Sequence, residues 1–176
     1  MKIKNFEFKV KVNNLESYEN QLLASNPLFI GMDHQTDTYF KVSQGRLKLR
    51  EGNIENALIH YDRENVKATK EAEVILYEHQ ADIALKEILS LHLGILVVVQ
   101  KKRKIYFIQN VKFHFDDVFG LGKFIEVEAI DKDGTLSKEE LKEQCSYYFN
   151  FFKFQSNDLL DKSYSDMLME KQKKIV

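Results

Sequence analysis

The chain has 176 residues, a formal net charge of −1 and a pI near 6.5. This length suits one domain with a sizeable core, and we expect a single domain over residues 1–176. The near-neutral charge disfavours a general nucleic-acid binder, which is usually basic overall. The single cysteine excludes an internal disulfide framework, and the longest apolar run, 94–99, is too short to span a bilayer. We therefore expect a cytoplasmic protein with neither a nucleic-acid nor a membrane partner.

In the first half of the chain, alternating apolar and polar residues predict strands, and one segment has the apolar spacing of a helix. The dipeptides Gln44–Gly45 and Gly52–Asn53 are typical of turns between strands. We expect strands over 3–12, 36–42, 46–50, 57–63 and 73–78, and a helix over 14–24.

The second half begins with a strongly apolar helical pattern, which we expect to form a central helix ended by Gly94. Ser137, followed three residues later by Glu140, is a capping box and predicts the start of another helix. We expect helices over 81–93, 137–149 and 164–173, and strands over 95–106, 107–118 and 123–130. The chain is thus predicted to be α+β, and eight antiparallel strands are enough to close a β-barrel with a lined interior.

Several predicted strands carry charged residues at two-residue spacing, which places them on one face of the strand. The rows are Arg46, Lys48 and Arg50; Lys9 and Lys11; Lys101 and Arg103; and Glu126 and Glu128. Any one row is most simply the solvated side of a sheet. Rows of matching phase on several strands favour a sheet wrapped around a charged interior.

A charged interior of this kind suits a small polyanion held together with a divalent metal. A triphosphate carries about four negative charges, so its site needs several cations and usually Mg²⁺. Arg and Lys bind phosphate through strong charge-assisted hydrogen bonds. The candidate phosphate-binding residues are Lys48, Arg50, Arg63, Lys101 and Arg103. The carboxylates available for a metal are Glu7, Asp116, Glu126 and Glu128.

A series of short motifs in this order resembles the CYTH superfamily, and in particular its class IV adenylate cyclase-like branch. The motifs are NFEFK at 5–9, DTYF at 37–40, GRLKLRE at 45–51, YDR at 61–63, KKRKIY at 101–106, KFHFDDVFGLGKFIEVE at 112–128 and SYSDML at 163–168. The family contains class IV adenylate cyclases and thiamine triphosphatases. The resemblance covers nearly the whole chain and implies an eight-stranded antiparallel tunnel with charged residues pointing inward.

The resemblance also implies roles for individual residues. The implied triphosphate-binding cations are Lys9, Lys48, Arg50, Arg63, Lys70, Lys101 and Arg103. The implied catalytic, metal-binding acids are Glu7, Asp116 and Glu126, with Glu128 as the second acid of its strand. The implied cofactor is Mg²⁺ or Mn²⁺, and the implied partner is a nucleoside or other organic triphosphate. A homodimer is common in the cyclase-like branch.

The chain departs from the family at its N-terminus, where the defining signature is ExExK. Here Asn5 replaces the first glutamate, while Glu7 and Lys9 keep their places. A second alignment, Glu7-x-Lys9-x-Lys11, loses the second acid instead. Replacing an acid by Asn removes one negative charge and is expected to lower metal affinity. Three functions therefore stay open: an adenylate cyclase, which we favour, a triphosphatase, and a triphosphate-binding protein without catalysis.

Overall fold

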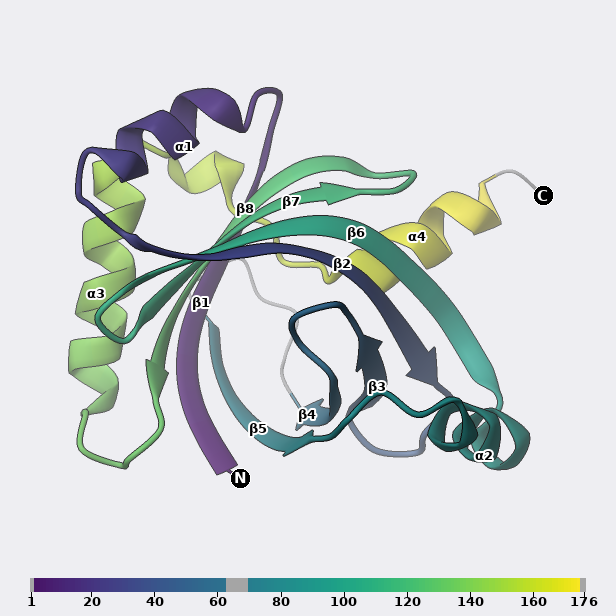
Figure 1. Cartoon of the computed structure of the whole chain (residues 1–176). Coiled ribbons are helices and arrows are strands. Elements are labelled where there is room, and N and C mark those ends of the chain that lie inside the picture. Colours follow the sequence, from purple (N-terminus) through teal and green to yellow (C-terminus); the bar gives the residue numbers. More distant parts are fainter. Residues whose placement is uncertain (1, 63–69, 175–176) are drawn as a thin grey trace.

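The computed structural model of the chain describes residues 2–62 and 70–174 and has an eight-stranded antiparallel barrel at its centre. The strand order is β1-β5-β4-β3-β2-β6-β7-β8, and β1 closes the barrel by pairing with both β5 and β8 (Figure 1). The strands are β1 (Lys2–Val12), β2 (Leu28–Phe40), β3 (Arg46–Glu51), β4 (Ala57–Asp62), β5 (Lys70–Glu78), β6 (Ile95–Ile108), β7 (Val111–Val118) and β8 (Gly122–Asp131). The predicted α+β barrel is confirmed.

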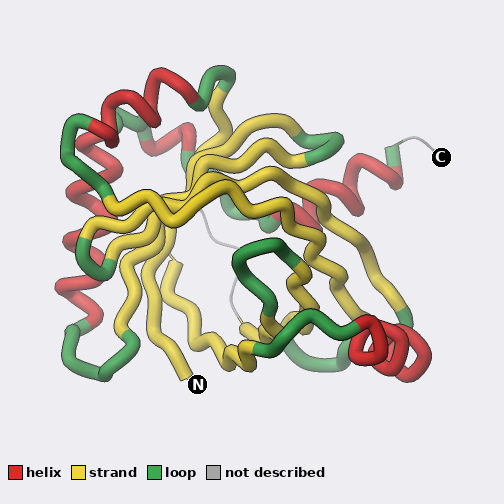
Figure 2. The backbone as a smooth tube through the Cα atoms, in the orientation of Figure 1, coloured by secondary structure: helices red, strands yellow, loops and turns green. Residues whose placement is uncertain are grey.

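Helices flank the barrel on several sides (Figure 2). They are α1 (Glu16–Leu23), α2 (Ile83–Leu93), α3 (Lys138–Phe151) and α4 (Tyr164–Lys173), and a 3-10 turn covers Ser156–Asp158. The capping box that predicted α3 is present, with the Glu140 amide donating to Ser137 Oγ at 3.2 Å. In the described part of the chain, no helix combines the length and apolar character needed to cross a bilayer.

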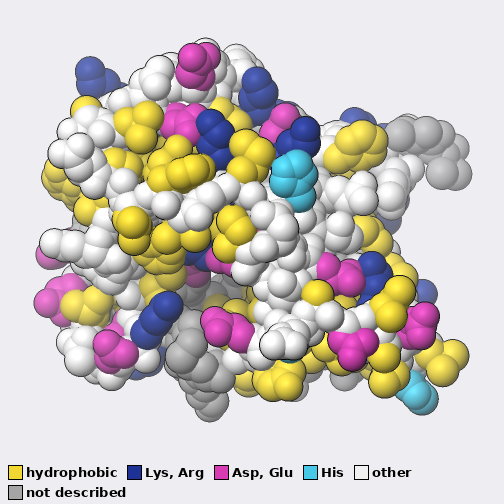
Figure 3. Space-filling model, in the orientation of Figure 1, with side chains coloured by type: hydrophobic (Ala, Val, Ile, Leu, Met, Phe, Trp, Pro, Cys, Tyr) yellow, Lys and Arg dark blue, Asp and Glu magenta, His cyan; other side chains and the backbone are white. Residues whose placement is uncertain are grey.

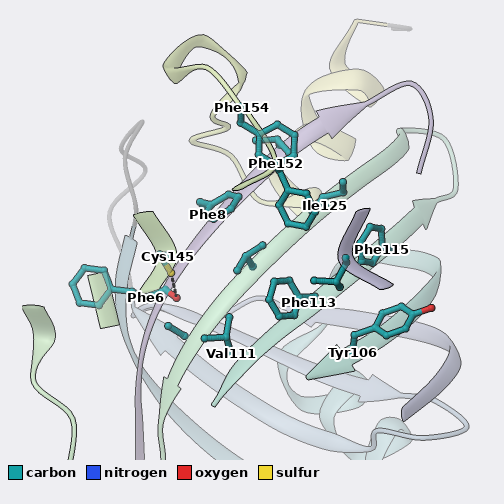
Figure 4. Close-up of a cluster of buried hydrophobic side chains, with 14 of the residues drawn as sticks. Phe6, Phe8, Tyr106, Val111, Phe113, Phe115, Ile125, Cys145, Phe152 and Phe154 are labelled. Atoms are coloured by element: carbon teal, nitrogen blue, oxygen red, sulfur yellow. Dashed lines mark hydrogen bonds between the residues drawn. The ribbon is translucent and has the colours of Figure 1, made fainter. Parts of the chain in front are cut away.

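The larger apolar cluster lies between the outside of the barrel and the helices α1 and α3, which Figure 1 shows beside it. Figure 4 shows many of its side chains. Strand alternation explains why the apolar side chains lie outside the barrel and not inside it. Phe6, Phe8 and Val10 of β1 point outward and are buried by the helices. The members from β7 and β8 include Val111, Phe113, Phe115, Ile125, Val127 and Ala129. Cys145 of α3 is buried here, and its thiol donates to the Phe6 carbonyl at 3.2 Å. The inward faces of the same strands are therefore left for polar residues.

The expectation that α2 is a central helix is wrong. The helix sits at one end of the barrel, none of its residues is buried, and Ile83 and Leu91 are 72% and 82% exposed. Hydrophobic side chains are visible over this helix at the lower right of Figure 3. An apolar helical pattern indicates that one face of the helix is suited to burial, but it does not indicate which other element packs against that face.

The largest differences from the predicted strand boundaries lie in β2 and at the junction of β6 and β7. Strand β2 begins at Leu28, well before residue 36, because its first half pairs with β6 across an irregularity at Gly31. Strand β6 continues to Ile108 and meets β7 through a tight turn in which Gln109 has a φ of 53°. A two-residue hairpin needs a positive φ of this kind, and Gln gives no sequence signal for it.

Candidate functional site

The barrel encloses a cavity of about 480 Å³ that is lined by inward-facing residues of its strands. Ser163 and Tyr164 at the N-terminus of α4 also line it, and both are buried. Eight of the residues predicted to form the site line this cavity: Glu7, Lys9, Lys48, Arg50, Lys101, Arg103, Glu126 and Glu128. Arg63 lies outside the described residues, and the Lys70 side chain is likewise not described.

One buried carboxylate in the cavity wall, that of Asp37, is surrounded by three cations. Arg50 donates through Nε and Nη2 to the two oxygens of Asp37 at 2.8 and 3.1 Å. The ammonium groups of Lys101 and Lys48 lie 2.6 and 3.2 Å from the same carboxylate. Burial would raise the pKa of Asp37, but the three cations outweigh it and hold the pKa well below its ordinary value. Asp37 therefore stays ionised and keeps these cations together.

The environment of Lys101 disfavours its charged form. Burial, together with Arg50, Arg103 and Lys48 nearby, lowers the pKa of Lys101 to about 7, despite its contact with Asp37. The ammonium is thus only partly protonated at neutral pH. An anion that enters the cavity is expected to restore its charge.

A second ion-pair cluster holds Arg103. Its Nε and Nη2 donate to the two oxygens of Asp116 at 2.7 and 2.6 Å, and Nη2 also donates to Glu126 at 2.9 Å. The Tyr164 hydroxyl donates to Asp116 at 2.7 Å. Asp116 is fully buried and is not among the cavity-lining residues. In this structure it orients Arg103 and does not present a free oxygen to a metal.

Lys9, His114 and Tyr164 gather around Glu126. Lys9 Nζ lies 3.5 Å from Glu126 Oε1 and 4.2 Å from the centre of the Tyr164 ring. His114 Nδ1 lies 3.4 Å from Glu126 Oε2. Burial and the charge of Arg103 lower the pKa of His114 to about 4, so the imidazole is neutral at neutral pH.

Oxygen donors suited to a hard cation lie along β1 and β8. Glu7 faces Glu128 directly across the two strands, and both line the cavity beside Asn5. Asn5 Nδ2 donates to Glu128 at 2.5 Å, while its buried Oδ1 has no hydrogen-bond partner among the described residues. Carboxylate and amide oxygens are the ligands that hard divalent cations prefer, so this donor set fits Mg²⁺ or Mn²⁺ chemically. As the described side chains stand, no three acidic, His or Cys groups converge on one metal position.

The cavity residues to which the sequence assigned no role include Asp37, Glu55, Lys112 and Tyr164. Lys112 shares the alternation of His114 and Asp116 on β7, so its inward direction was available from the sequence. Asp37 shares that of Tyr39 on β2. Glu55 lies in a loop and Tyr164 on a helix distant in sequence, and no periodicity marks either of them.

Comparisons with known proteins agree with this architecture. The model of the CYTH domain family matches residues 4–162. A structure from Pyrococcus horikoshii is 24% identical, with a TM-score of 0.78 over 92% of this chain and 98% of the other. A "putative adenylate cyclase" from Vibrio parahaemolyticus is 20% identical, with a TM-score of 0.71 over 94% and 97%.

A cyclase-like protein from Hippeastrum, described as having a dominant triphosphatase activity, is 11% identical. Its TM-score is 0.61 over 98% of this chain and 96% of the other. No curated protein matches the chain. At these identities the solved structures establish the fold, and the family match covers most of the chain. This chain therefore belongs to the CYTH domain family.

Proposed function

We propose that this chain is a metal-dependent enzyme that acts on an organic triphosphate inside the barrel. The observation that carries the proposal is the convergence of Lys48, Arg50 and Lys101 within 3.2 Å of one buried carboxylate, that of Asp37. The acids paired with these groups are Asp37 and Glu55, and they face four basic side chains, those of Lys48, Arg50, Lys101 and Lys112, which leaves a local excess of positive charge. A buried excess of this kind is costly unless an anion completes it.

The cavity is polarised in a way that suits a metal–triphosphate complex. Cations of β3 and β6 lie on one side, and the opposed Glu7 and Glu128 of β1 and β8 lie on the other. Phosphate oxygens would bind the cations, with Lys9 and Arg103 alongside. Glu7, Glu126 and Glu128, with the Asn5 carbonyl oxygen, would hold a divalent ion, which neutralises charge that develops on phosphate oxygens. Asp116 acts through Arg103, which it orients.

An apolar part of the cavity wall supports an organic substituent on the phosphate chain. Ala57 and Ile59 of β4 and Val74 and Leu76 of β5 line it, close to Tyr61. A ligand composed of phosphate alone has no apolar surface that could pack against these side chains. An adenine, a thiamine or a comparable ring would bury apolar surface against them.

The leading reaction is cyclisation of ATP. The ribose 3′ oxygen attacks the α-phosphorus, the bond to the bridging oxygen of the β-phosphate breaks, and pyrophosphate leaves. The hydroxyl proton passes to solvent. Lys48, Arg50 and Lys101 stabilise the charge on the departing pyrophosphate, and products are cyclic AMP and pyrophosphate.

Hydrolysis is the second candidate, because the same cations hold a triphosphate whose γ-phosphorus is attacked by water. The Hippeastrum protein with dominant triphosphatase activity shares the fold, so the fold does not separate the two reactions. Asn5 favours a third outcome, binding without turnover, since it supplies no charge to a metal.

The test is product analysis with ATP, GTP, thiamine triphosphate and inorganic tripolyphosphate, each with Mg²⁺ and then with Mn²⁺. Cyclic AMP with pyrophosphate from ATP would establish the cyclase. Orthophosphate release would establish a triphosphatase and identify its substrate. Calorimetric binding without product would establish a binding protein, and absence of both binding and product would refute the proposal.

A further inference from the structure

The loop between β3 and β4, residues 52–56, turns toward the barrel interior (Figure 2). Ile54, Glu55 and Asn56 all line the cavity. An ordinary hairpin loop is exposed to solvent, so a carboxylate that such a loop carries into a cationic cavity needs an explanation.

The loop is held in this position by the fully buried carboxylate of Asp33. The Ile54 and Glu55 amides each donate to it at 3.0 Å. Gly52 permits this approach, because a Cβ there would lie 2.5 Å from Asp33 Oδ1. Asn56 closes the loop by exchanging hydrogen bonds of 3.1 and 3.0 Å with the Gly52 backbone. The backbone of the loop is therefore fixed at both ends.

The Glu55 carboxylate is fixed as well. One oxygen accepts from Arg50 Nη1 at 2.9 Å and from Gln35 Nε2 at 3.0 Å, and the other is paired with the Lys112 ammonium. Burial would raise the pKa of Glu55, but Lys112 and Arg50 outweigh it and lower the pKa. Glu55 is thus ionised at neutral pH, and its charge offsets that of the Lys112 ammonium and part of that of the Arg50 guanidinium, which it contacts at Nη1.

Glu55 and Tyr164 mark opposite ends of the cationic interior. Their partners on β7, Lys112 and Asp116, are four residues apart, which is about 13 Å along a strand. Lys101 and Arg103 pair in register with β7 at its Asp116 end. A phosphate chain bound to these inner cations would meet the Glu55 carboxylate as it extended toward Lys112.

We propose that Glu55 is a specificity-determining residue that limits the length of the phosphate chain. The Glu55 carboxylate is paired with the Lys112 ammonium and with Nη1 of Arg50, so these groups do not bind an additional phosphate. The negative charge of Glu55 also repels an additional phosphate. The inference rests on the proposed function, that a polyphosphate binds inside the barrel. It assigns that site a preference for a triphosphate over longer chains.

The experiment compares inorganic tripolyphosphate and tetrapolyphosphate by calorimetry, at fixed Mg²⁺, on the wild type, Glu55→Gln and Glu51→Gln. Glu51 is the matched control, because it removes the same charge from a residue that pairs with Lys86 of α2 and does not line the cavity. Releasing Lys112 adds a charge-assisted contact for a fourth phosphate. Glu55→Gln is therefore expected to shift the affinity ratio toward tetrapolyphosphate by about tenfold, and Glu51→Gln is expected to leave it unchanged.

Each result has a distinct meaning. An unchanged ratio in Glu55→Gln, with tripolyphosphate still bound by the wild type, would overturn the role of Glu55 and leave the proposed function intact. If neither ligand bound to the wild type or to Glu55→Gln, both proposals would fall. Circular dichroism checks that the variants fold. If Glu55→Gln does not fold, Glu55→Ala takes its place, because it also removes the carboxylate that pairs with Lys112 and Arg50, and a ratio unchanged there would equally overturn the inference.

Discussion

Binding of a triphosphate to this cavity is expected to take up a proton at Lys101. Without ligand, burial and the cations Arg50, Arg103 and Lys48 lower the pKa of Lys101 to about 7. A bound polyanion stabilises the charged form and so raises that pKa toward its ordinary value. The complex thus binds more protons than the free protein, so the affinity is expected to be highest below pH 7 and to fall as the pH rises above it.

The expected proton uptake and its effect on affinity depend on how far the pKa of Lys101 lies below the working pH. At pH 8 a group with a pKa of about 7 is about one-tenth protonated, so ligand binding is expected to add about 0.9 proton at Lys101. Each pH unit above 7 is expected to weaken binding by about tenfold, or about 1.4 kcal/mol, until the pKa of the bound state is reached.

Calorimetry of tripolyphosphate binding in two buffers of different ionisation enthalpy measures the proton uptake. Lys101→Met removes the titrating group, and the difference from the wild type cancels protons exchanged by the ligand itself. Lys102→Met is the control, since Lys102 is the exposed neighbour on the outer face of β6. Equal proton uptake in the wild type and Lys101→Met, with binding measurable in both, would refute the reasoning.

Three further predictions concern neighbouring groups. Asp37→Asn leaves Lys48, Arg50 and Lys101 without their shared anion and is expected to lower the free energy of unfolding by about 3–5 kcal/mol, as measured by thermal unfolding. Added tripolyphosphate should restore much of this loss, and the control Asp62→Asn, at an exposed residue, should not show it. An unchanged unfolding temperature would contradict the role of Asp37. Tyr164→Phe removes the hydroxyl that donates to Asp116 and is expected to lower the free energy of unfolding by about 1–2 kcal/mol, whereas Tyr147→Phe, at a side chain that is 62% exposed, should be close to neutral. Asn5→Glu adds a carboxylate beside Glu128 and is expected to tighten Mn²⁺ binding in calorimetry and to lower stability without metal; an unchanged Mn²⁺ affinity would exclude Asn5 from the metal site.

The two faces of each strand could be predicted from the sequence. A strand has a period of two, so residues spaced by two share a face without reference to any other part of the chain. This rule alone places Lys48 with Arg50, Lys101 with Arg103, and Glu126 with Glu128. It also places Asn5, Glu7 and Lys9 together on the lining of the cavity. The apolar alternate positions explain why the larger core lies outside the barrel.

Contacts between different strands, by contrast, depend on how the whole chain folds. Asp37 and Lys101 are 64 positions apart and meet because β2 and β6 are neighbours in the closed barrel. Asp116 has the spacing of a cavity-lining acid, yet its contacts with Arg103 and Tyr164 take both of its oxygens. Glu55 enters the interior because Asp33 binds its loop. Such pairings depend on register and barrel closure, which are properties of the whole sheet and leave no mark on a local segment of sequence.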